Sequence, residues 1–282
     1  MKTGIHSKIL LFMAIPITVL GVAAFYNGLI VRNYIVITDK FEEGVSIRAV
    51  LISDLHSHIH GHGQSKLISK IRGQNPDVIL LAGDIADDKT PIKGTELLLE
   101  GIKDMAPVFY VTGNHEYWSG EVENIKDTIR SYGVTVLEDE YKEIIINGVH
   151  VIIAGVCDPE RVMYEEKGLG KPEHENLSEA GQKDHFKILI SHRPEQIGQY
   201  EKYKFDLAAS GHAHGGQVRI PFLLNGLFAP NQGWFPKYAG GRYEFGTMTH
   251  IVSRGVSFNP ILPRVFNPPE IVVIDIFKGG KK

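Results

Sequence analysis

The chain has 282 residues, of which 43% are hydrophobic and 22% charged, as in an ordinary globular protein. Its net charge of -3 gives no broad basic surface for a nucleic-acid backbone, so we expect no nucleic-acid partner. The single cysteine, Cys157, excludes an intrachain disulfide and a thiolate metal cluster. The 13 histidines crowd into a few short segments, which points toward metal binding.

Residues 9–31 carry no charged side chain and are mostly apolar. About 20 such residues span a bilayer as a helix, so we predict a transmembrane anchor at 9–31 after a short tail at 1–8. A signal peptide cleaved near 22–24 and a buried helix are the alternatives. Positive charges before the stretch, the N-terminal amine included, slightly outnumber those after it. This favours a single-pass protein of the cell membrane with most of the chain outside the cytoplasm.

After a polar linker at 32–47, short apolar runs alternate with amphipathic stretches. Uninterrupted apolar runs of this length predict strands that are buried on both faces. The predicted buried strands are 48–54, 77–84, 108–115, 186–192 and 205–212. Apolar residues that recur every three or four positions predict helices at 64–72, 95–103 and 121–132. Strands alternating with helices indicate an α/β domain with a sheet core.

The rest of the chain completes one predicted domain at 48–277, followed by a tail at 278–282. Asn147-Gly148 between two apolar runs predicts a tight hairpin. The segment 160–183 is polar and is expected to be a long insertion or loop. Further strands are predicted at 247–253 and 271–277.

Every predicted buried strand ends in residues of metal-binding types. These are Asp54 with His56, Asp84, Asn114 with His115, His192, and His212 with His214. Each pair alone is explained equally well as a turn or a helix cap. Ligands of open α/β sheets bind at the carboxyl ends of the strands, so these side chains are expected to converge. Burying them together without partners would be costly, which favours a cation site.

These residues form an ordered set of motifs. The set comprises Asp54-x-His56, Gly83-Asp84-x-x-Asp87, Gly113-Asn114-His115-Glu116, His192 and Gly211-His212-x-His214. Over residues 48–214 it resembles the calcineurin-like metallophosphoesterase superfamily. The segments 211–217, 253–255 and 266–270 look like the membrane-associated bacterial YkuE/YaeI-type branch. The resemblance implies a four-layer α/β/β/α sandwich after the transmembrane helix, and a hydrolase that cleaves a phosphodiester or a phosphoanhydride.

The resemblance also implies two divalent metal ions (Mn, Fe or Zn) that share Asp84. Asp54, His56 and His214 would complete the first metal site, and Asn114, His192 and His212 the second. A hydroxide that bridges the metals would attack phosphorus. His115 would protonate the leaving group, and Asp87 would orient His115. Glu116 departs from the pattern, because this branch often has Asp there, and its longer side chain puts the local geometry in doubt.

Several interpretations stay open at this point. The chain could be a non-catalytic scaffold of the same fold, although such a protein should have lost site residues, or a secreted nucleotide phosphodiesterase. The apolar segments 222–230 and 234–236 indicate either an ordinary packed loop or an apolar lip that admits a lipid-linked substrate beside the membrane. His58, His60 and His62 exceed the motif and are expected to be solvated, and Cys157-Asp158 is expected to be a turn.

Overall fold

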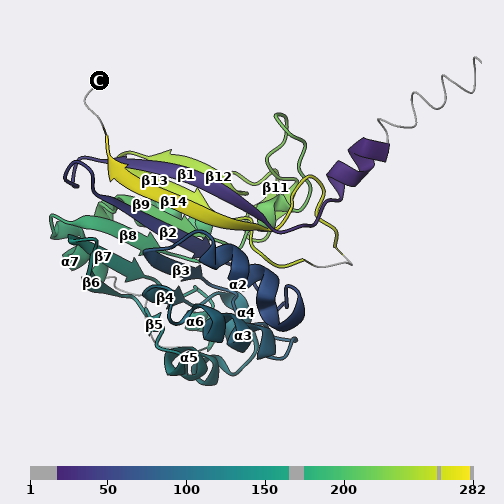
Figure 1. Cartoon of the computed structure of the whole chain (residues 1–282), viewed down its shortest axis with the longest axis horizontal. Coiled ribbons are helices and arrows are strands. Elements are labelled where there is room, and N and C mark those ends of the chain that lie inside the picture. Colours follow the sequence, from purple (N-terminus) through teal and green to yellow (C-terminus); the bar gives the residue numbers. More distant parts are fainter. Residues whose placement is uncertain (1–17, 165–174, 259–261, 280–282) are drawn as a thin grey trace, which may run out of the picture.

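The computed structural model describes residues 18–164, 175–258 and 262–279. Two six-stranded sheets form its centre (Figure 1). The first has the order β1 (Ile30–Thr38), β14 (Glu270–Lys278), β2 (Ser46–Ile52), β3 (Val78–Ala82), β4 (Val108–Val111), β5 (Thr135–Val136). The second has the order β12 (Gly241–Phe245), β13 (Met248–Val252), β9 (Leu207–Ser210), β8 (Phe186–Ile190), β7 (Val149–Gly155), β6 (Glu140–Ile146).

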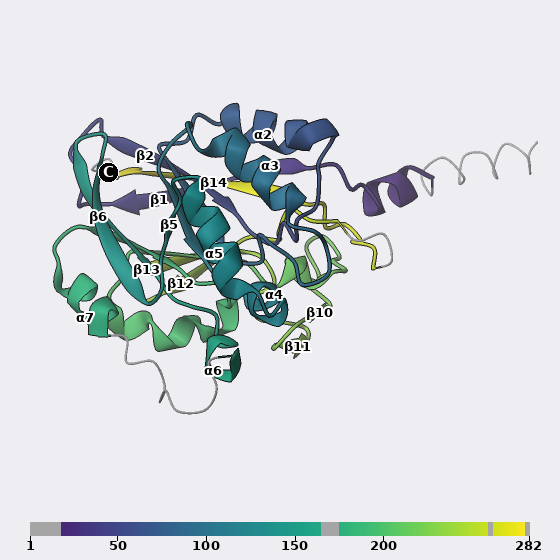
Figure 2. The ribbon, with the colours of Figure 1, turned by 90° about the horizontal axis from the view of Figure 1, so that it is seen from below.

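Helices cover the outer faces of both sheets (Figure 2). The α-helices are α2 (Ser65–Arg72), α3 (Lys93–Ile102), α4 (Asn114–Trp118), α5 (Val122–Ser131), α6 (Arg161–Tyr164) and α7 (Glu175–Gln182). Four 3-10 turns, η1 (His62–Gln64), η2 (Pro194–Gln199), η3 (Glu201–Tyr203) and η4 (His214–Gly216), and a small hairpin, β10 (Phe228–Ala229) with β11 (Gly233–Trp234), complete the described elements.

Side-chain alternation along the strands explains the layers, as β2 illustrates. Ile47, Ala49 and Leu51 point into the apolar core between the two sheets. Val50 and Ile52 point the other way, into a second core beneath α2, α3 and α5. A third core lies between the second sheet and α7 with η2. Strands buried on both faces are uniformly apolar, and the expected α/β fold with helix, sheet, sheet and helix layers follows from them.

Most predicted elements are found within a few residues of their expected positions. The five predicted buried strands correspond to β2, β3, β4, β8 and β9, and the three helices to α2, α3 and α5. Asn147 and Gly148 both have positive φ, of 51° and 80°, and connect β6 to β7 as the expected hairpin. Within the predicted insertion, α6 and α7 form at its two ends, and residues 165–174 lie outside the described part.

The N-terminal boundaries differ from the prediction. Residues 30–38 were expected to end the anchor and begin a linker, but they form β1, which pairs in parallel with β14. The reason is that Val36, 3% exposed, completes the core between the sheets, so the folded domain begins at Ile30. Residues 18–24 are helical, and no helix among the described residues is long and apolar enough to cross a membrane. Residues 25–29 are not helical, and residues 9–17 of the predicted anchor lie outside the described residues.

Candidate metal centre

The sheet topology gathers the predicted site residues at one edge. β2, β3 and β4 are parallel neighbours, as are β8 and β9, so the carboxyl ends of each set lie together. Asp54, Asp84, His192 and His212 each stand two residues beyond such a strand, and Asn114 begins α4 directly after β4. Backbone hydrogen bonds between the loops, such as that from the Asp54 amide to the Gly83 carbonyl at 3.1 Å, hold the edge together.

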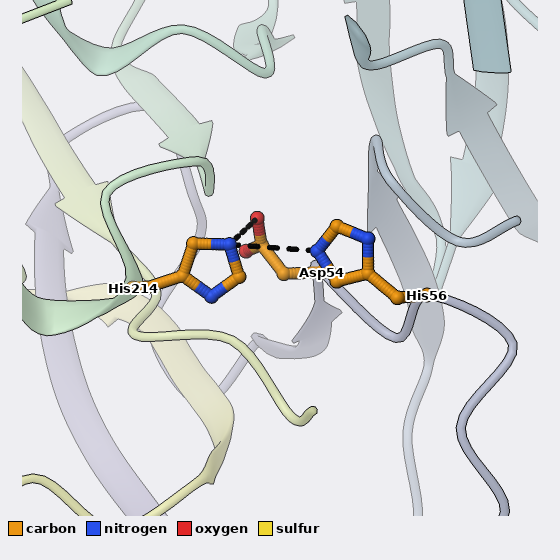
Figure 3. Close-up of side chains that lie close together, drawn as sticks. All are labelled: Asp54, His56 and His214. Carbon is orange, nitrogen blue, oxygen red and sulfur yellow. Dashed lines mark hydrogen bonds and ion pairs between the residues drawn. The ribbon is translucent and has the colours of Figure 1, made fainter. Parts of the chain in front are cut away.

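A first group of side chains consists of Asp54, His56 and His214, whose ligand atoms are close enough to hold one metal ion. Figure 3 shows the two imidazoles approaching the buried carboxylate from opposite sides. His214 Nε2 lies 3.6 Å from Asp54 Oδ1, and the Nε2 atoms of His56 and His214 are 3.4 Å apart. Burial lowers the pKa of His214 to about 3, so its imidazole is neutral, the form that binds a metal.

A second group consists of Asp84, His192 and His212, all of them buried. His192 Nδ1 donates to the Ala82 carbonyl at 2.7 Å. Without a metal, burial opposes protonation of His192, yet Asp84 raises its pKa to about 10. A neutral, metal-binding ring would keep its proton on Nδ1, because a carbonyl can only accept, and would turn the lone pair of Nε2 toward Asp84 Oδ2 at 3.1 Å. Asp84 also lies within reach of the first group, 3.9 Å from His56 Nε2, and so stands between the two groups.

Three buried lone-pair atoms of the predicted ligands have no hydrogen-bond partner among the described residues: Asp54 Oδ2, Asn114 Oδ1 and His192 Nε2. The His192–Asp84 pair is close in distance but not aligned for a hydrogen bond. A buried polar atom without a partner costs about 1–3 kcal/mol, so three of them together require an explanation. A cation accepts all three lone pairs, and the mixture of oxygen and imidazole donors suits Mn, Fe or Zn. The residues therefore fit divalent metal ions.

The backbone at the site is strained. Asp54, His56, Asp84, His212 and His214 all have positive φ, between 47° and 66°. Left-handed conformations cost non-glycine residues about 1–3 kcal/mol where the surrounding structure imposes them, and they cluster at functional sites. The amide of His212 donates to Asp54 Oδ1 at 2.9 Å, which holds one of these turns. These backbone conformations direct the side chains of the five residues into one small volume.

Glycines of the motifs allow the loops to approach one another. A Cβ on Gly113 would collide with the Asp84 carboxylate, and a Cβ on Gly211 would collide with Ser53 and with the Asp54 carboxylate. Neither position leaves room for a side chain, so each loop passes directly over the neighbouring carboxylate. The glycines of the Gly-Asn-His and Gly-His segments are thus needed for packing, whereas the residues that follow them supply the chemistry.

His115 lies beside the two groups with carboxylates behind it. Its Nδ1 is 2.7 Å from Asp88 Oδ1 and 3.1 Å from Asp87 Oδ1. Asp87 contacts His115 as expected, but it also lies 3.2 Å from His56 Nδ1, and Asp88 makes the shorter contact. Burial opposes protonation of His115, yet the carboxylates of Asp87, Asp84 and Asp88 outweigh it and raise the pKa to about 9. A protonated imidazole can therefore stand ready at neutral pH.

A pocket of about 390 Å³ opens over the first group. Its wall includes His56, His115, His214 and Asp87, with Arg264 on a further side. Burial lowers the pKa of Arg264 to about 10, so its guanidinium stays charged at neutral pH. The cavity is thus lined by imidazoles, one carboxylate and one buried cation.

Comparison with known proteins assigns the chain to a family. The family model described as calcineurin-like phosphoesterase matches residues 47–216, more than half of the chain. The chain belongs to the calcineurin-like phosphoesterase family. It is thus a metallophosphoesterase, a class of hydrolases that act on phosphoester bonds, and the resemblance seen in the motifs is confirmed.

Relatives of this phosphoesterase carry the same designation. An uncharacterized metallophosphoesterase of Campylobacter jejuni is 30% identical over 240 residues, 83% of this chain and 60% of that protein. One of Aquifex aeolicus is 29% identical over 259 residues, 89% of this chain and 92% of that protein. YkuE of Bacillus subtilis is 28% identical over 215 residues, 74% of this chain and 71% of that protein. The chain thus spans less than two thirds of the Campylobacter relative.

Glu116 has a structural role in the phosphoesterase that the sequence did not reveal. Its buried carboxylate accepts four backbone hydrogen bonds, from the amides of Asp84, Ile85, Ala86 and Gly113. Burial, and next the charge of Asp84, raises the pKa of Glu116 to about 7. The side chain joins the loop after β3 to the loop after β4, and its length suits that span.

Two further residues orient His212 in the phosphoesterase. Asp158, expected in a turn, forms a buried ion pair with Arg193 at 2.6 and 2.9 Å. Arg193 Nη1 donates to Asn231 Oδ1, which also lies 2.8 Å from His212 Nε2. Arg193 Nη1 also lies 3.3 Å from His212 Nε2, so Asn231 and Arg193 both engage this nitrogen and Nδ1 is the ring nitrogen left for the second group. Arg193 and Asn231 lack any local motif, so sequence reasoning missed them.

The extra histidines do not share one environment. His58 lines the pocket of the phosphoesterase rather than standing in solvent. His60 is half-buried, and burial together with His58 lowers its pKa to about 4. His62 is exposed, as expected.

The apolar segments after the last motif are packed only in part: Ala229 and Pro236 are buried, whereas four large side chains are not. Phe222, Leu223, Trp234 and Phe235 are exposed, by 112%, 81%, 68% and 68%. The small hairpin that carries Trp234 lies toward the same end of the molecule as the helix of residues 18–24 (Figure 1). Large apolar side chains that stay exposed are candidates for a contact surface. We call these four residues the apolar lip.

Proposed function

We propose that this phosphoesterase hydrolyses a phosphodiester or a phosphoanhydride with two divalent metal ions. Asp54, His56 and His214 hold one ion, and Asn114, His192 and His212 hold the other, with Asp84 shared between them. The observation that carries the proposal is the set of three buried, unpaired donor atoms at the junction of the two groups. When bound, such ions lower the pKa of water toward ~7 and neutralise charge that develops on a phosphoryl group.

The residues around the ions supply proton transfer. His115 Nδ1 is held by Asp88 and Asp87, so its Nε2 carries the proton that the leaving oxygen needs. Asp87 holds His56 Nδ1 as well, which turns His56 Nε2 toward Asp54 and His214. The carboxylate of Asp87 therefore positions both the proton donor, His115, and one metal-binding imidazole, His56.

The substrate is proposed to be amphiphilic. The apolar lip is exposed, and the amide of Phe266 donates to the Ala24 carbonyl at 2.7 Å, which joins the chain near Arg264 to the helix of residues 18–24. This arrangement supports a membrane anchor that precedes β1 and holds the site beside a membrane. The charge balance around the apolar stretch favours a domain outside the cytoplasm. A lipid-linked phosphoester would place its apolar part on the lip and its phosphate in the pocket.

Hydrolysis by the full-length protein tests the proposal. The protein is stripped of metal, supplied with Mn, Zn or Fe, and assayed with bis-p-nitrophenyl phosphate and p-nitrophenyl phosphate. We expect metal-dependent turnover that disappears in Asp84→Ala. A wild-type protein that binds metal but hydrolyses neither compound, nor a phospholipid or a nucleotide diphosphate sugar, would favour the non-catalytic scaffold. N-terminal sequencing of the mature protein separates an anchored enzyme from a secreted nucleotide phosphodiesterase.

A further inference from the structure

Arg264 is a buried cation that forms no ion pair with a carboxylate of the described residues, although Asp54 and Glu270 lie near enough to act on its charge. It is 3% exposed and lines the pocket. Among the described residues its guanidinium contacts only the Arg254 carbonyl, through Nη1, and His214 Nδ1, 3.3 Å from Nη2. The nearby Arg254 differs, since it forms a buried ion pair with Glu270 at 2.8 Å. A buried guanidinium with five N–H donors and so few acceptors is unusual, because charged donors are expensive to leave unsatisfied.

A metal ion bound by His214 Nε2 would remove the hydrogen bond between His214 and Arg264. His214 Nε2 points at Asp54 and His56, so it is the atom that binds the ion. A neutral imidazole that gives the lone pair of Nε2 to a metal carries its proton on Nδ1. His214 Nδ1 and Arg264 Nη2 are then both donors, and no hydrogen bond joins them. Arg264 Nη2 is left without an acceptor among the described residues.

The pocket gives that free donor a defined neighbour. The imidazole ring of His214 lies between the Arg264 guanidinium and Asp54. Arg264 and the two histidines of the first group line the same cavity of about 390 Å³. The pocket is also polarised by charge, because Asp87 lines it beside His115 and would repel a second anionic group there. An anionic oxygen beyond the reacting phosphoryl group is accommodated beside Arg264.

We propose that Arg264 binds the phosphoryl group next to the one attacked, so that the enzyme selects diphosphate diesters over compounds with a single phosphate. The inference rests on the proposed two-metal hydrolysis and chooses between the bond types left open there. Phe258 and Leu262, which line the pocket together with Arg264, would contact the group attached to the second phosphate. Arg264 thus binds the substrate, and it is not required for binding of the metal ions.

Binding of two stable anions tests this role directly. Full-length protein loaded with Mn is titrated calorimetrically with methylene diphosphonate and with methylphosphonate, and Mn content is measured after each titration. We expect Arg264→Gln to weaken binding of the diphosphonate by about 10- to 100-fold, the loss typical of a hydrogen bond to a charged group. Binding of methylphosphonate should change less than about 3-fold. Arg264→Lys, which keeps the charge without the forked geometry, should restore part of the loss.

A matched variant and a stability measurement keep the test decisive. Arg242 is exposed and pairs with Glu244, so Arg242→Gln removes one positive charge elsewhere and should alter neither titration. Thermal unfolding checks each variant, and Arg264→Lys carries the test if Arg264→Gln does not fold. Equal losses for both anions, or loss of Mn from the Arg264 variants, would overturn the role in selectivity. If Arg264→Gln weakens binding of the two anions unequally but the wild-type protein shows no turnover, the role of Arg264 stands and the proposed hydrolysis is rejected.

Discussion

Single residues decide the chemistry of this centre, and some of them are much easier to predict from the sequence than others. All nine predicted site residues reach one edge of the sheets, because each follows a buried strand and the strand pattern is local. Asp88, Arg193, Asn231 and Arg264 were missed, because each acts through a partner far away in the chain that no local pattern reveals. Glu116 was noticed only as a departure from a motif, and its role became clear from its four backbone partners.

Replacing Glu116 tests its role as a junction between loops. In Glu116→Gln an amide nitrogen faces backbone amides in place of one carboxylate oxygen, so two of the four hydrogen bonds are lost. We expect a loss of about 3 kcal/mol in the free energy of unfolding, measured with urea, together with weaker Mn binding. Glu121→Gln, at an exposed position nearby, should change stability by less than about 0.5 kcal/mol. Equal stabilities of the two variants would contradict this role.

His115 is tested with leaving groups of different acidity. His115→Asn removes the proton donor, so turnover of an alkyl phosphodiester should fall by about 10²- to 10⁴-fold. Turnover of a p-nitrophenyl ester should fall much less, because p-nitrophenolate leaves without protonation. Metal content, measured in parallel, should stay at the wild-type value. A uniform fall for both esters would show that His115 does not act as the acid.

Whole elements were predictable where both faces of a strand are buried, and less so at the edge of a sheet. β2, β3, β4, β8 and β9 are short, mostly apolar runs, so their positions could be predicted from the sequence pattern. β1 is an edge strand with one neighbour, β14, which follows more than 200 residues later. Its mixture of apolar and polar residues suggests the end of an anchor followed by a linker. Only the pairing with β14 shows that the segment belongs to the sheet.

Two adjacent residues of β1 test its contribution to the fold. Val36 is 3% exposed in the core between the sheets, whereas Ile37 is 65% exposed. Val36→Ala should lower the free energy of unfolding by about 2 kcal/mol through lost burial and a small cavity. Ile37→Ala should lower it by less than about 0.5 kcal/mol. Urea unfolding of both variants decides the point, and similar values would mean that β1 is not part of the cooperative core.

At the scale of the whole molecule, the apolar lip and the N-terminal segment accompany the metal centre on one polypeptide. β1 and β14 pair in the first sheet, and the amide of Phe266 donates to the Ala24 carbonyl, which brings residues 18–24 beside the segment that contains Arg264. The sequence indicated the apolar character of both regions. Their exposure and their relative position depend on the tertiary fold and could not be predicted from it.

The apolar lip predicts a difference between dispersed and soluble substrates. Replacing Trp234 and Phe235 together by Ser removes two of its large exposed side chains. We expect turnover of a phosphodiester in mixed micelles to fall by about 10-fold or more, because apolar contact area with the micelle is lost. Turnover of soluble bis-p-nitrophenyl phosphate should stay within about 2-fold of wild type. Unchanged hydrolysis of the micellar substrate would reject a role for the lip.

The central claim is that two metal ions act in one centre built from both sheets. The most direct measurement is titration of the metal-free full-length protein with Mn, with bound Mn and turnover of bis-p-nitrophenyl phosphate followed in the same samples. The account predicts two bound equivalents per chain, turnover that requires both, and no turnover in Asp84→Ala, which removes the shared carboxylate. Full turnover with one equivalent, or turnover that persists without metal, would contradict it.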